Sequence, residues 1–449
     1  MITSVCCLGA GYVGAPSLSI FAKRNPAIDF YVLDISQQRI DAWNSEQLPI
    51  YEPGLQEVIE QVRNKNLFFS TNICEIVPKC EVVFVCVNTP TKLYGIGGGH
   101  ALDISMIESA ARMIAPIIRE NQIIVEKSTV PVHTAHVIHE ILQRNTTTKF
   151  AVLSNPEFLA EGTAIHDLEN PSRVLIGGDH QESIDILREL YHWIPNEKIL
   201  TMGIWSSELS KLVANAFLAQ RISSINTIAA LCERTGASVT DVARSIRTDP
   251  RIGHMFLEPS VGFGGSCFQK DLSCLVYLCR NFHLDEEADY WEQVLNINDF
   301  QRNRFVKNIS DVMYHSLSNK TFVMLGFAFK KNTGDTRESS AIDIANQLLN
   351  ENAILRIYDP QVQLEDIPKE IRNSNRVTIY TQTNPTIIAK DADAILIVTE
   401  WDEFKELPYA VFYEQMRKPA YLFDGRRVIS PNLLRTMGFY VYQIGEPPV

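Results

Sequence analysis

Residues 2–14 read ITSVCCLGAGYVG, an apolar run that ends in the hexapeptide Gly9-Ala10-Gly11-Tyr12-Val13-Gly14. This G-x-G-x-x-G pattern is typical of a strand that turns directly into a helix. Its first glycine permits the turn, the second lets a pyrophosphate approach the backbone, and the third lets helix and strand pack closely. We therefore predict a doubly wound α/β domain that binds a dinucleotide. The alternative is a glycine turn with only a structural role.

A second apolar run, Phe30–Leu33, ends in Asp34 at the spacing expected after such a turn. A carboxylate at this place accepts a hydrogen bond from the ribose 2′-hydroxyl and repels a 2′-phosphate. Asp34 therefore favours NAD over NADP. Arg39 is an opposite signal, because a nearby arginine can hold a 2′-phosphate.

Three more apolar runs, Val82–Val87, Ile123–Val125 and Ala151–Leu153, have the continuous apolar character of buried parallel strands. The polar segments NTPT (88–91), EKSTVP (126–131) and SNPEFLAEG (154–162) follow them. Ligands of doubly wound sheets bind outside the carboxyl ends of the strands, so we expect these segments to face the cofactor and substrate. The i,i+4 spacing of Glu157 and Glu161 would place two carboxylates on one helix face, which is costly unless they are used.

The segment Trp205-Ser206-Ser207-Glu208 has the serine cap and first-turn acid of a helix start. Apolar periodicity continues to Gly236, where we expect the helix to stop. Because the segment carries few charges, we predict a buried connector between domains. Lys211 and Asn215 lie one turn apart on it. Lys211 either reaches solvent along the connector or, in a dry cleft, binds an anion or moves protons.

The stretch GFGGSCFQKD, residues 262–271, places three glycines before a single cysteine. A helix that starts near Ser266 would put Cys267 in its first turn, where free N–H groups and the helix dipole stabilise a thiolate. Lys270 and Asp271 would follow on the same helix face. The pattern is that of a nucleophilic cysteine, and the alternative is a flexible turn before a buried structural cysteine.

The last third of the chain repeats the order of the first domain without its glycines. The strand Thr321–Leu325, a polar loop, a helix near Ala341–Leu349 and the strand Leu355–Tyr358 lead to Asp359. Two further strands are expected at Ala394–Val398 and Tyr421–Phe423. This order predicts a second Rossmann-like sheet.

Positive charge is expected at the carboxyl edge of this second sheet, from Lys330, Arg337 and Arg427. The alternative is that these three side chains are solvated surface cations. The predicted fold is α/β, with two Rossmann-like doubly wound domains joined by a long central helix and a helical middle region. The expected regions are 1–204, 205–317 and 318–449.

The composition is that of an ordinary globular protein of more than one domain, with 449 residues and 45% hydrophobic content. A net charge of −12 argues against nucleic acid or an anionic membrane as a main partner. No signal peptide or bilayer-spanning run is expected. Nine scattered cysteines without metal-ligand spacing predict no metal site and a reducing, cytoplasmic compartment, with Cys74, Cys80 and Cys86 as packed thiols.

Nearly the whole chain, from Val5 to about Gly445, resembles the nucleotide-sugar 6-dehydrogenases, and among them the animal-type UDP-glucose 6-dehydrogenases. The resemblance is carried by the glycine hexapeptide and by further stretches, which are 87–92, 126–131, 154–164, 205–226, 261–271, 326–340 and 423–428. It implies a four-electron oxidation of UDP-glucose to UDP-glucuronate with two NAD. It also implies two Rossmann-like domains joined by a long helix, and dimers that assemble into a hexamer.

The resemblance also implies roles for individual residues. NAD would be held by Gly9, Ala10, Gly11, Tyr12, Val13, Gly14, Asp34, Arg39, Val87, Asn88, Thr89, Pro90, Thr91, Ser128, Thr129, Val130, Glu161 and Arg337. UDP-glucose would be bound by Glu157, Phe158, Leu159, Ala160, Glu161, Lys211, Asn215, Arg251, Phe256, Phe263, Gly264, Phe329, Lys330 and Arg427. The catalytic residues would be the nucleophile Cys267 with Thr129, Glu157, Lys211, Asn215 and Asp271, and Arg251 would come from the neighbouring subunit.

This chemistry suits the residue types. Oxidation of an alcohol to an acid passes through an aldehyde, which a cysteine can retain as a thiohemiacetal and then a thioester. The reaction needs a base, an oxyanion stabiliser and a carboxylate that positions water. The base would be Glu157 or Lys211, the oxyanion stabiliser Asn215 and the water-positioning carboxylate Asp271. Which of Glu157 and Lys211 moves which proton is left open.

Two alternative functions remain from the sequence. One is a sister dehydrogenase that acts on another nucleotide sugar, such as GDP-mannose or a UDP-amino sugar. The other is a catalytically silent nucleotide-binding subunit. Glu258 suggests the second, because close animal relatives carry a lysine there and the change removes a cation beside the substrate segment.

Overall fold

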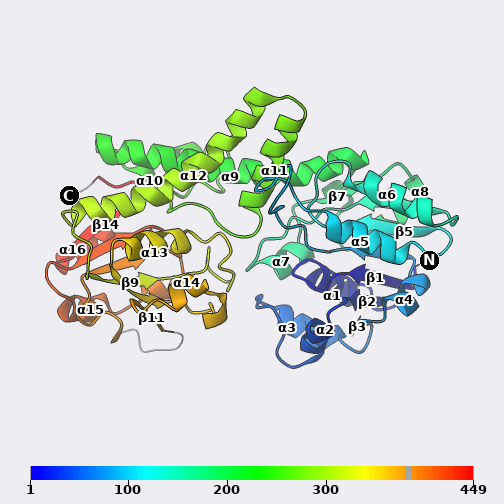
Figure 1. The fold of residues 1–449 in the computed structure, drawn as a ribbon, viewed down its shortest axis with the longest axis horizontal. Helices are drawn as coiled ribbons and strands as arrows, with labels where there is room; N and C mark the ends of the chain where they lie inside the picture. Colours follow the sequence, from blue (N-terminus) through cyan, green and yellow to red (C-terminus); the bar gives the residue numbers. More distant parts are fainter. Residues whose placement is uncertain (1, 381–386, 448–449) are drawn as a thin grey trace. The chain divides into compact units, whose positions relative to one another are not determined.

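The computed structural model describes residues 2–380 and 387–447, which form two units (Figure 1). The first contains Met1–Ala214 and Ser273–His283, and the second contains Asn215–Leu272 and Leu284–Val449. Two helices contribute residues to both units, α9 (Ile204–Thr235) and α11 (Phe268–Asn281). The helical middle region predicted at 205–317 is therefore divided between the units.

The first unit is built on an eight-stranded sheet in the order β3-β2-β1-β4-β5-β6-β7-β8. All neighbours pair in parallel except β6 and β7. Its strands are β1 (Ser4–Leu8), β2 (Asp29–Leu33), β3 (Leu67–Ser70), β4 (Val82–Val85), β5 (Gln122–Glu126), β6 (Phe150–Ser154), β7 (Val174–Gly177) and β8 (Ile199–Met202). The 3-2-1-4-5-6 core of this order is that of the predicted Rossmann-like fold.

Helices cover both faces of this sheet, and alternate residues of β1 show why. Val5 and Cys7 lie in one apolar cluster, whereas Cys6 and Leu8 lie in a second cluster on the opposite face. The first cluster includes side chains of α1 (Gly14–Arg24), α3 (Leu55–Val62) and α8 (Gln181–Leu190), and the second includes side chains of α5 (Ser105–Ile114) and α6 (Thr134–Asn145). The shorter helices are α2 (Gln37–Asn44), α4 (Ile73–Ile76) and α7 (Ala164–Glu169).

The second unit contains a six-stranded, wholly parallel sheet in the order β11-β10-β9-β12-β13-β14. Its strands are β9 (Thr321–Leu325), β10 (Ile354–Tyr358), β11 (Val377–Tyr380), β12 (Ala394–Ile397), β13 (Tyr421–Asp424) and β14 (Tyr440–Gln443). Its helices are α10 (Val239–Arg247), α12 (Asp285–Val312), α13 (Ser340–Asn350), α14 (Lys369–Arg372), α15 (Tyr409–Gln415) and α16 (Pro431–Thr436). The predicted second Rossmann-like sheet is confirmed.

The acid after the second strand of each sheet supports the turn after the first strand. The amide of Ala10 donates to Asp34 Oδ2 at 2.9 Å. In the second unit, the amides of Phe327 and Ala328 donate to Asp359 Oδ2 at 2.7 and 3.0 Å. The order of strand, loop, helix, strand and acid, which occurs twice in the sequence, thus gives the same hydrogen-bonding arrangement in both units.

Three local expectations need correction. The connector α9 is not buried throughout, because Phe217 and Leu231 on it are exposed. The connector α9 begins at Ile204, before the predicted serine cap, although it ends as expected before Gly236, whose φ is +79°. Of the three cysteines predicted to be packed, Cys80 and Cys86 are buried but Cys74 is exposed. Cys74 lies on the single-turn helix α4, which buries only Ile73.

Among residues 2–380 and 387–447, no helix combines the length and the apolar character needed to cross a membrane.

Candidate active site

The glycine turn after β1 has the geometry that a pyrophosphate requires. Gly9 has a φ of +108°, and an added Cβ would lie 2.5 Å from the carbonyl oxygen of Cys86. A Cβ on Gly14 would lie 2.2 Å from the carbonyl oxygen of Gly9. Beside Gly11, by contrast, the nearest atom to an added Cβ is Asn88 Oδ1 at 4.0 Å. The turn therefore leaves open backbone in front of the first residues of α1, which fits a dinucleotide.

The side chain of Asp34 is buried at the end of β2 and holds three groups. Its Oδ2 accepts from the amide of Ala10 and lies 3.2 Å from Arg39 Nη1, while Oδ1 accepts from the amide of Ser36 at 2.9 Å. Asp34, which favours NAD, and Arg39, which could favour NADP, thus form one ion pair. While Asp34 is present, one nitrogen of the Arg39 guanidinium is paired with its carboxylate.

We expect Asp34→Ala to lower the ratio of kcat/KM for NAD to kcat/KM for NADP by about 10- to 100-fold. A charge-assisted hydrogen bond of about 1.5–3 kcal/mol to the ribose is lost, and Arg39 is released. Steady-state kinetics with both cofactors measures the ratio. Asp34→Asn is the control that retains an acceptor for Ala10. Equal use of both cofactors by the unmutated protein would contradict the assignment.

The polar segments after β4 and β5 contact each other. Thr89 Oγ1 donates to the carbonyl oxygen of Thr129 at 2.6 Å, and Ser128 Oγ donates to that of Val87 at 2.7 Å. Two predicted cofactor segments thus form one continuous edge at the carboxyl ends of neighbouring strands. This edge belongs to the same sheet end as the glycine turn, because β1 pairs with β4 and β4 pairs with β5 in parallel.

The segment after β6 brings two predicted catalytic groups together. Lys211 Nζ lies 3.2 Å from Glu157 Oε1, and both side chains are buried. Glu157 Oε2 accepts from the amide of Leu159 at 2.8 Å. Two cations lie near the ring of Phe158, with Lys211 Nζ 5.3 Å and the guanidinium of Arg173 3.8 Å from its centroid.

The expectation that Glu157 and Glu161 share a helix face is wrong. Residues 155–160 have no regular secondary structure, and the next helix, α7, begins only at Ala164. Lys211 instead supplies the positive charge opposite Glu157. Of the two alternatives for Lys211, burial against Glu157 favours the lysine in a dry environment.

Cys267 is the residue immediately before α11. Its carbonyl oxygen accepts the first helical hydrogen bond, from the amide of Asp271 at 2.9 Å. The prediction placed Cys267 within the first turn, but regular helical structure begins one residue later, at Phe268. At this N-cap position the partly exposed cysteine still lies at the positive end of the helix dipole.

The carboxylate of Asp271 is fully buried one turn after Cys267 and is held on both oxygens. Asn215 Nδ2 donates to Oδ2 at 2.5 Å, and Lys270 Nζ lies 2.5 Å from Oδ1. Asn215 therefore forms one cluster with Lys270 and Asp271, although it is distant from them in the sequence. The positions of both carboxylate oxygens are fixed by donors.

The loop before Cys267 lies against the segment that follows β9. A Cβ on Gly265 would come within 2.8 Å of the ring of Phe329, and the amide of Gly265 donates to the carbonyl oxygen of Arg337 at 2.9 Å. Lys330 Nζ lies 5.5 Å from the centroid of Phe329. These predicted substrate and cofactor residues thus cluster around the cysteine loop. The side chain of Phe263 is buried and packs against the ring of Phe268.

Other predicted residues form contacts outside this cluster. Arg251 pairs with Asp249 at 2.7 Å on the surface. Arg427 donates to the carbonyl oxygen of Ile444 at 2.5 Å and to Glu446 at 2.9 Å. Phe256 is the exception among these residues, because its ring lies 6.3 Å from that of Phe268, the residue after Cys267. Their substrate contacts remain predictions.

Glu258 pairs with Arg247 at 2.6 Å and is exposed. Its negative charge therefore has a local partner, which weakens the reason that the sequence offered for a silent subunit.

Sequence analysis missed several residues that support the site. Glu52 is buried, accepts from the amides of Gly162 and Ala164 at 2.8 and 2.6 Å, and contacts the hydroxyl of Tyr12. It thereby joins the glycine turn to the segment after β6. No pattern in the sequence pairs Glu52 with either segment.

A buried carboxyl lies beside the predicted cofactor edge. Glu126, the last residue of β5, is 1% exposed, and burial raises its pKa well above the ordinary value, with the negative charge of Glu208 acting in the same direction. Glu208 accepts from the amides of His133 and Ala135 at the start of α6, at 2.8 and 2.7 Å. Glu126 therefore keeps its proton to higher pH than an ordinary glutamic acid does.

We expect Glu126→Gln to stabilise the fold increasingly as the pH rises above 4.5. Above that pH the unfolded chain loses this proton while the folded protein keeps it, so stability falls with rising pH until the folded pKa is reached. The slope is about 1.4 kcal/mol per pH unit. Thermal unfolding midpoints of both proteins at pH 5 and 7.5 measure it. Glu140→Gln is the control of opposite sign, because the hydrogen bond from Arg144 lowers the pKa of this half-buried glutamate. An unchanged pH dependence in Glu126→Gln would contradict the raised pKa of Glu126.

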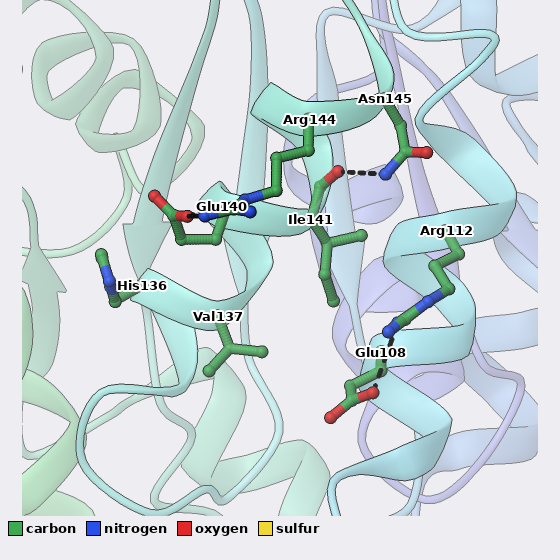
Figure 2. Close-up of a pocket in the computed structure, with 8 residues that line it drawn as sticks. All are labelled: Glu108, Arg112, His136, Val137, Glu140, Ile141, Arg144 and Asn145. Atoms are coloured by element: carbon green, nitrogen blue, oxygen red, sulfur yellow. Dashed lines mark hydrogen bonds and ion pairs between the residues drawn. The ribbon is translucent and has the colours of Figure 1, made fainter.

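A surface hollow of about 370 Å³ lies between α5 and α6, away from these residues (Figure 2). Figure 2 shows an ion pair within each helix, Glu108 with Arg112 at 3.3 Å and Glu140 with Arg144 at 2.8 Å. None of its eight lining residues is a predicted site residue. The hollow is therefore not the candidate active site.

Comparison with known proteins identifies the chain. Three family models match, all of the UDP-glucose/GDP-mannose dehydrogenase family: the NAD binding domain at residues 3–194, the central domain at 205–300 and the UDP binding domain at 323–431. UDP-glucose 6-dehydrogenase 1 of Glycine max is 53% identical over 469 residues, covering 99% of this chain and 98% of the relative. UDP-glucose 6-dehydrogenase 4 of Arabidopsis thaliana is 52% identical over 468 residues, with the same coverage.

Solved structures agree in fold. A UDP-glucose dehydrogenase from Pyrobaculum islandicum superposes with a TM-score of 0.87 at 28% identity, covering 100% of this chain and 98% of that one. A UDP-D-ManNAc dehydrogenase from Pyrococcus horikoshii gives a TM-score of 0.82 at 25% identity, with complete coverage of both chains. The animal type expected from the sequence stays a prediction, since the two sequence relatives are plant proteins. The chain belongs to the UDP-glucose/GDP-mannose dehydrogenase family, and within it to the UDP-glucose 6-dehydrogenases.

Proposed function

We propose that this chain oxidises UDP-glucose to UDP-glucuronate in two successive NAD-dependent steps, with Cys267 as the covalent nucleophile. Membership of the UDP-glucose 6-dehydrogenases makes NAD-dependent oxidation of UDP-glucose its activity. The observation that supports the covalent route is the cysteine at the N-terminus of α11, with a buried carboxylate fixed one turn later.

In the first step, the alcohol at carbon 6 of the glucose loses a hydride and a proton and becomes an aldehyde. Bound NAD supplies the nicotinamide ring that accepts a hydride in each step. The proton passes to the buried pair of Glu157 and Lys211, whose side chains lie 3.2 Å apart. Because the two groups share one contact, either can accept the proton while the other stabilises the change in charge. Thr129 belongs to the edge proposed to orient the cofactor near this carbon.

In the second step, the thiolate of Cys267 attacks the aldehyde carbon and forms a thiohemiacetal. Asn215 is proposed to donate to the developing oxyanion. Loss of the second hydride converts the thiohemiacetal into a thioester. Water then attacks the thioester carbon, Asp271 accepts a proton from that water, and the carbon–sulfur bond breaks to release the thiolate and a carboxylic acid, which loses its remaining proton to solvent.

Substrate recognition is proposed for two sets of residues, each described within its own unit. In the first unit, the backbone and ring of Phe158 through Ala160 would contact the sugar beside Lys211. In the second unit, Phe329 and Lys330, which lie against the cysteine loop, would contact the UDP group, and Lys330 would bring positive charge to the diphosphate. The further proposed contacts are Glu161, Arg251, Phe256, Phe263, Gly264 and Arg427.

NAD is proposed to lie along the glycine turn and the neighbouring strand ends. Asp34 would accept from the ribose hydroxyls, and the first residues of α1 would face the pyrophosphate. The other proposed cofactor contacts are Arg39, Val87, Asn88, Thr89, Pro90, Thr91, Ser128, Thr129, Val130, Glu161 and Arg337.

We further propose that the chain forms dimers that assemble into a hexamer and that it acts in the cytoplasm. Large apolar side chains are exposed on the two longest helices, which supports self-association. They are Phe217 and Leu231 on α9 and Tyr290 and Phe300 on α12. The exposed guanidinium of Arg251 is proposed to reach the substrate of a neighbouring subunit. Sedimentation of the purified protein gives the oligomeric state.

The decisive experiment measures NADH formed per UDP-glucose consumed. The proposal predicts a ratio of two, with UDP-glucuronate as the product. GDP-mannose and UDP-N-acetylmannosamine, assayed in parallel, test the sister activities. A ratio of one, or a higher kcat/KM for either of those sugars, would contradict the proposed function.

A further inference from the structure

The backbone of Phe263, four residues before Cys267, is held on both sides by one amide side chain. Asn298 Oδ1 accepts from the amide of Phe263 at 2.8 Å, and Asn298 Nδ2 donates to its carbonyl oxygen at 3.0 Å. Asn298 lies on α12 and is completely buried. Its side chain therefore pairs with the loop as a neighbouring strand would, using both a donor and an acceptor.

Arg302, one turn later on α12, completes the arrangement. Its Nη2 donates to the same carbonyl oxygen of Phe263 at 2.8 Å and to that of Glu338 at 3.3 Å. Its Nη1 donates to Asp343 at 2.6 Å. One buried guanidinium thus joins the cysteine loop to the segment after β9, which includes the proposed substrate and cofactor residues.

The cysteine loop has no room for added side chains at its glycines on either side of Phe263. Gly262 has a φ of +112°, and an added Cβ would lie 2.6 Å from Asn298 Oδ1. On the other side of Phe263, a Cβ on Gly264 would lie 2.3 Å from the carbonyl oxygen of Glu338. Because Gly262 and Gly264 have no side chains, the loop can approach both α12 and the segment after β9 closely.

We propose that Asn298 and Arg302 are positioning residues that hold the loop so that Cys267 captures the aldehyde before it escapes. The inference rests on the proposed function of Cys267. Neither residue is assigned a contact with substrate. They act through the backbone of Phe263 and, in the case of Arg302, through that of Glu338.

The proposal predicts an effect on one step only. The first oxidation forms an aldehyde without any bond to sulfur, so it does not depend on where the thiolate lies. The second oxidation requires the thiohemiacetal, and a small displacement of a reacting atom can cost about 100-fold in rate. A loosened loop would therefore release aldehyde after one hydride, whereas a merely destabilised protein would show fewer active molecules with an unchanged ratio of products.

The test uses Asn298→Asp in the full-length protein. This change keeps the acceptor for the amide of Phe263 but places a carboxylate oxygen against its carbonyl oxygen. We expect NADH per UDP-glucose consumed to fall from two towards one, with a free aldehyde trapped by a hydrazine reagent. We also expect the rate of Cys267 alkylation by iodoacetamide to change at least threefold.

Asn308→Asp is the matched control. Asn308 lies on the same helix and donates its amide to the hydroxyl of Tyr442 at 2.6 Å, outside the cysteine loop. We expect it to keep a ratio of two and the alkylation rate of the unmutated protein. Arg302→Lys, which keeps the charge but not the planar fork of donors, is the second test variant and is evaluated in the same way if Asn298→Asp does not fold.

The inference is overturned if a folded test variant keeps a ratio of two and normal alkylation, even when its total activity falls. A ratio of one in the unmutated protein would instead remove the proposed function. In that case the alkylation rate alone decides whether Asn298 and Arg302 position Cys267.

Discussion

Replacement of Cys267 by serine is expected to yield about one NADH per active site and then to stop turnover. Without the thiolate, the aldehyde from the first oxidation cannot become a thioester, because serine has no accessible ionised form near neutral pH unless a base is directed at it. Binding of UDP-glucose and NAD should change little. Loss of a covalent nucleophile should lower kcat for the complete reaction by at least about 10³-fold.

NADH absorbance, measured against the concentration of active sites, tests this expectation, and mass spectrometry identifies the retained sugar. Cys279→Ser is the matched control, since Cys279 lies on the same helix α11 and is also partly exposed. It should keep two NADH per UDP-glucose. Steady two-hydride turnover by Cys267→Ser near the normal rate would return this stretch to the alternative of a structural cysteine.

The strands predicted from sequence are interior strands of the two sheets, with a hydrogen-bonded neighbour on each side. Among them, β1, β4, β5, β9 and β12 are covered on both faces, so the residues in the middle of each strand are apolar. The unpredicted strands β3, β8, β11 and β14 are the edges of the two sheets and contain exposed or half-buried residues. Their short, mixed patterns resemble those of loops. β7 is an interior strand that the sequence analysis does not predict, although it is as short and as buried as β4 and β12.

Within the candidate site, features that depend on neighbours in the sequence could be predicted, whereas contacts between distant segments could not. The glycine turn, the cysteine loop and Asp34 could be predicted because each depends on neighbours in the sequence. The pairing of Lys211 with Glu157 could not, since it joins α9 to a segment without regular structure. Asn298 and Arg302 also gave no local signal. Buried polar residues such as these are unusual, but only the structure shows that this face of α12 is buried.

Asp271→Asn is expected to separate oxidation from hydrolysis. The carboxylate is fully buried, with Asn215 and Lys270 each 2.5 Å from one of its oxygens. An amide in its place retains an acceptor for Asn215 but cannot take a proton from water. Both hydrides should still be transferred, because neither transfer uses this group. We therefore expect a rapid burst of about two NADH per site, followed by turnover slowed about 10²- to 10⁴-fold.

The size of the burst distinguishes this variant from Cys267→Ser, which should release about one NADH per site. A thioester should accumulate on Cys267 and appear as an added mass on its peptide after acid quenching. Lys270→Met is the matched control, because it removes the ion pair but leaves the carboxylate in place. It should slow turnover much less than Asp271→Asn and show no burst. A burst of one NADH in Asp271→Asn, or no covalent mass on Cys267, would mean that Asp271 acts before the thioester forms.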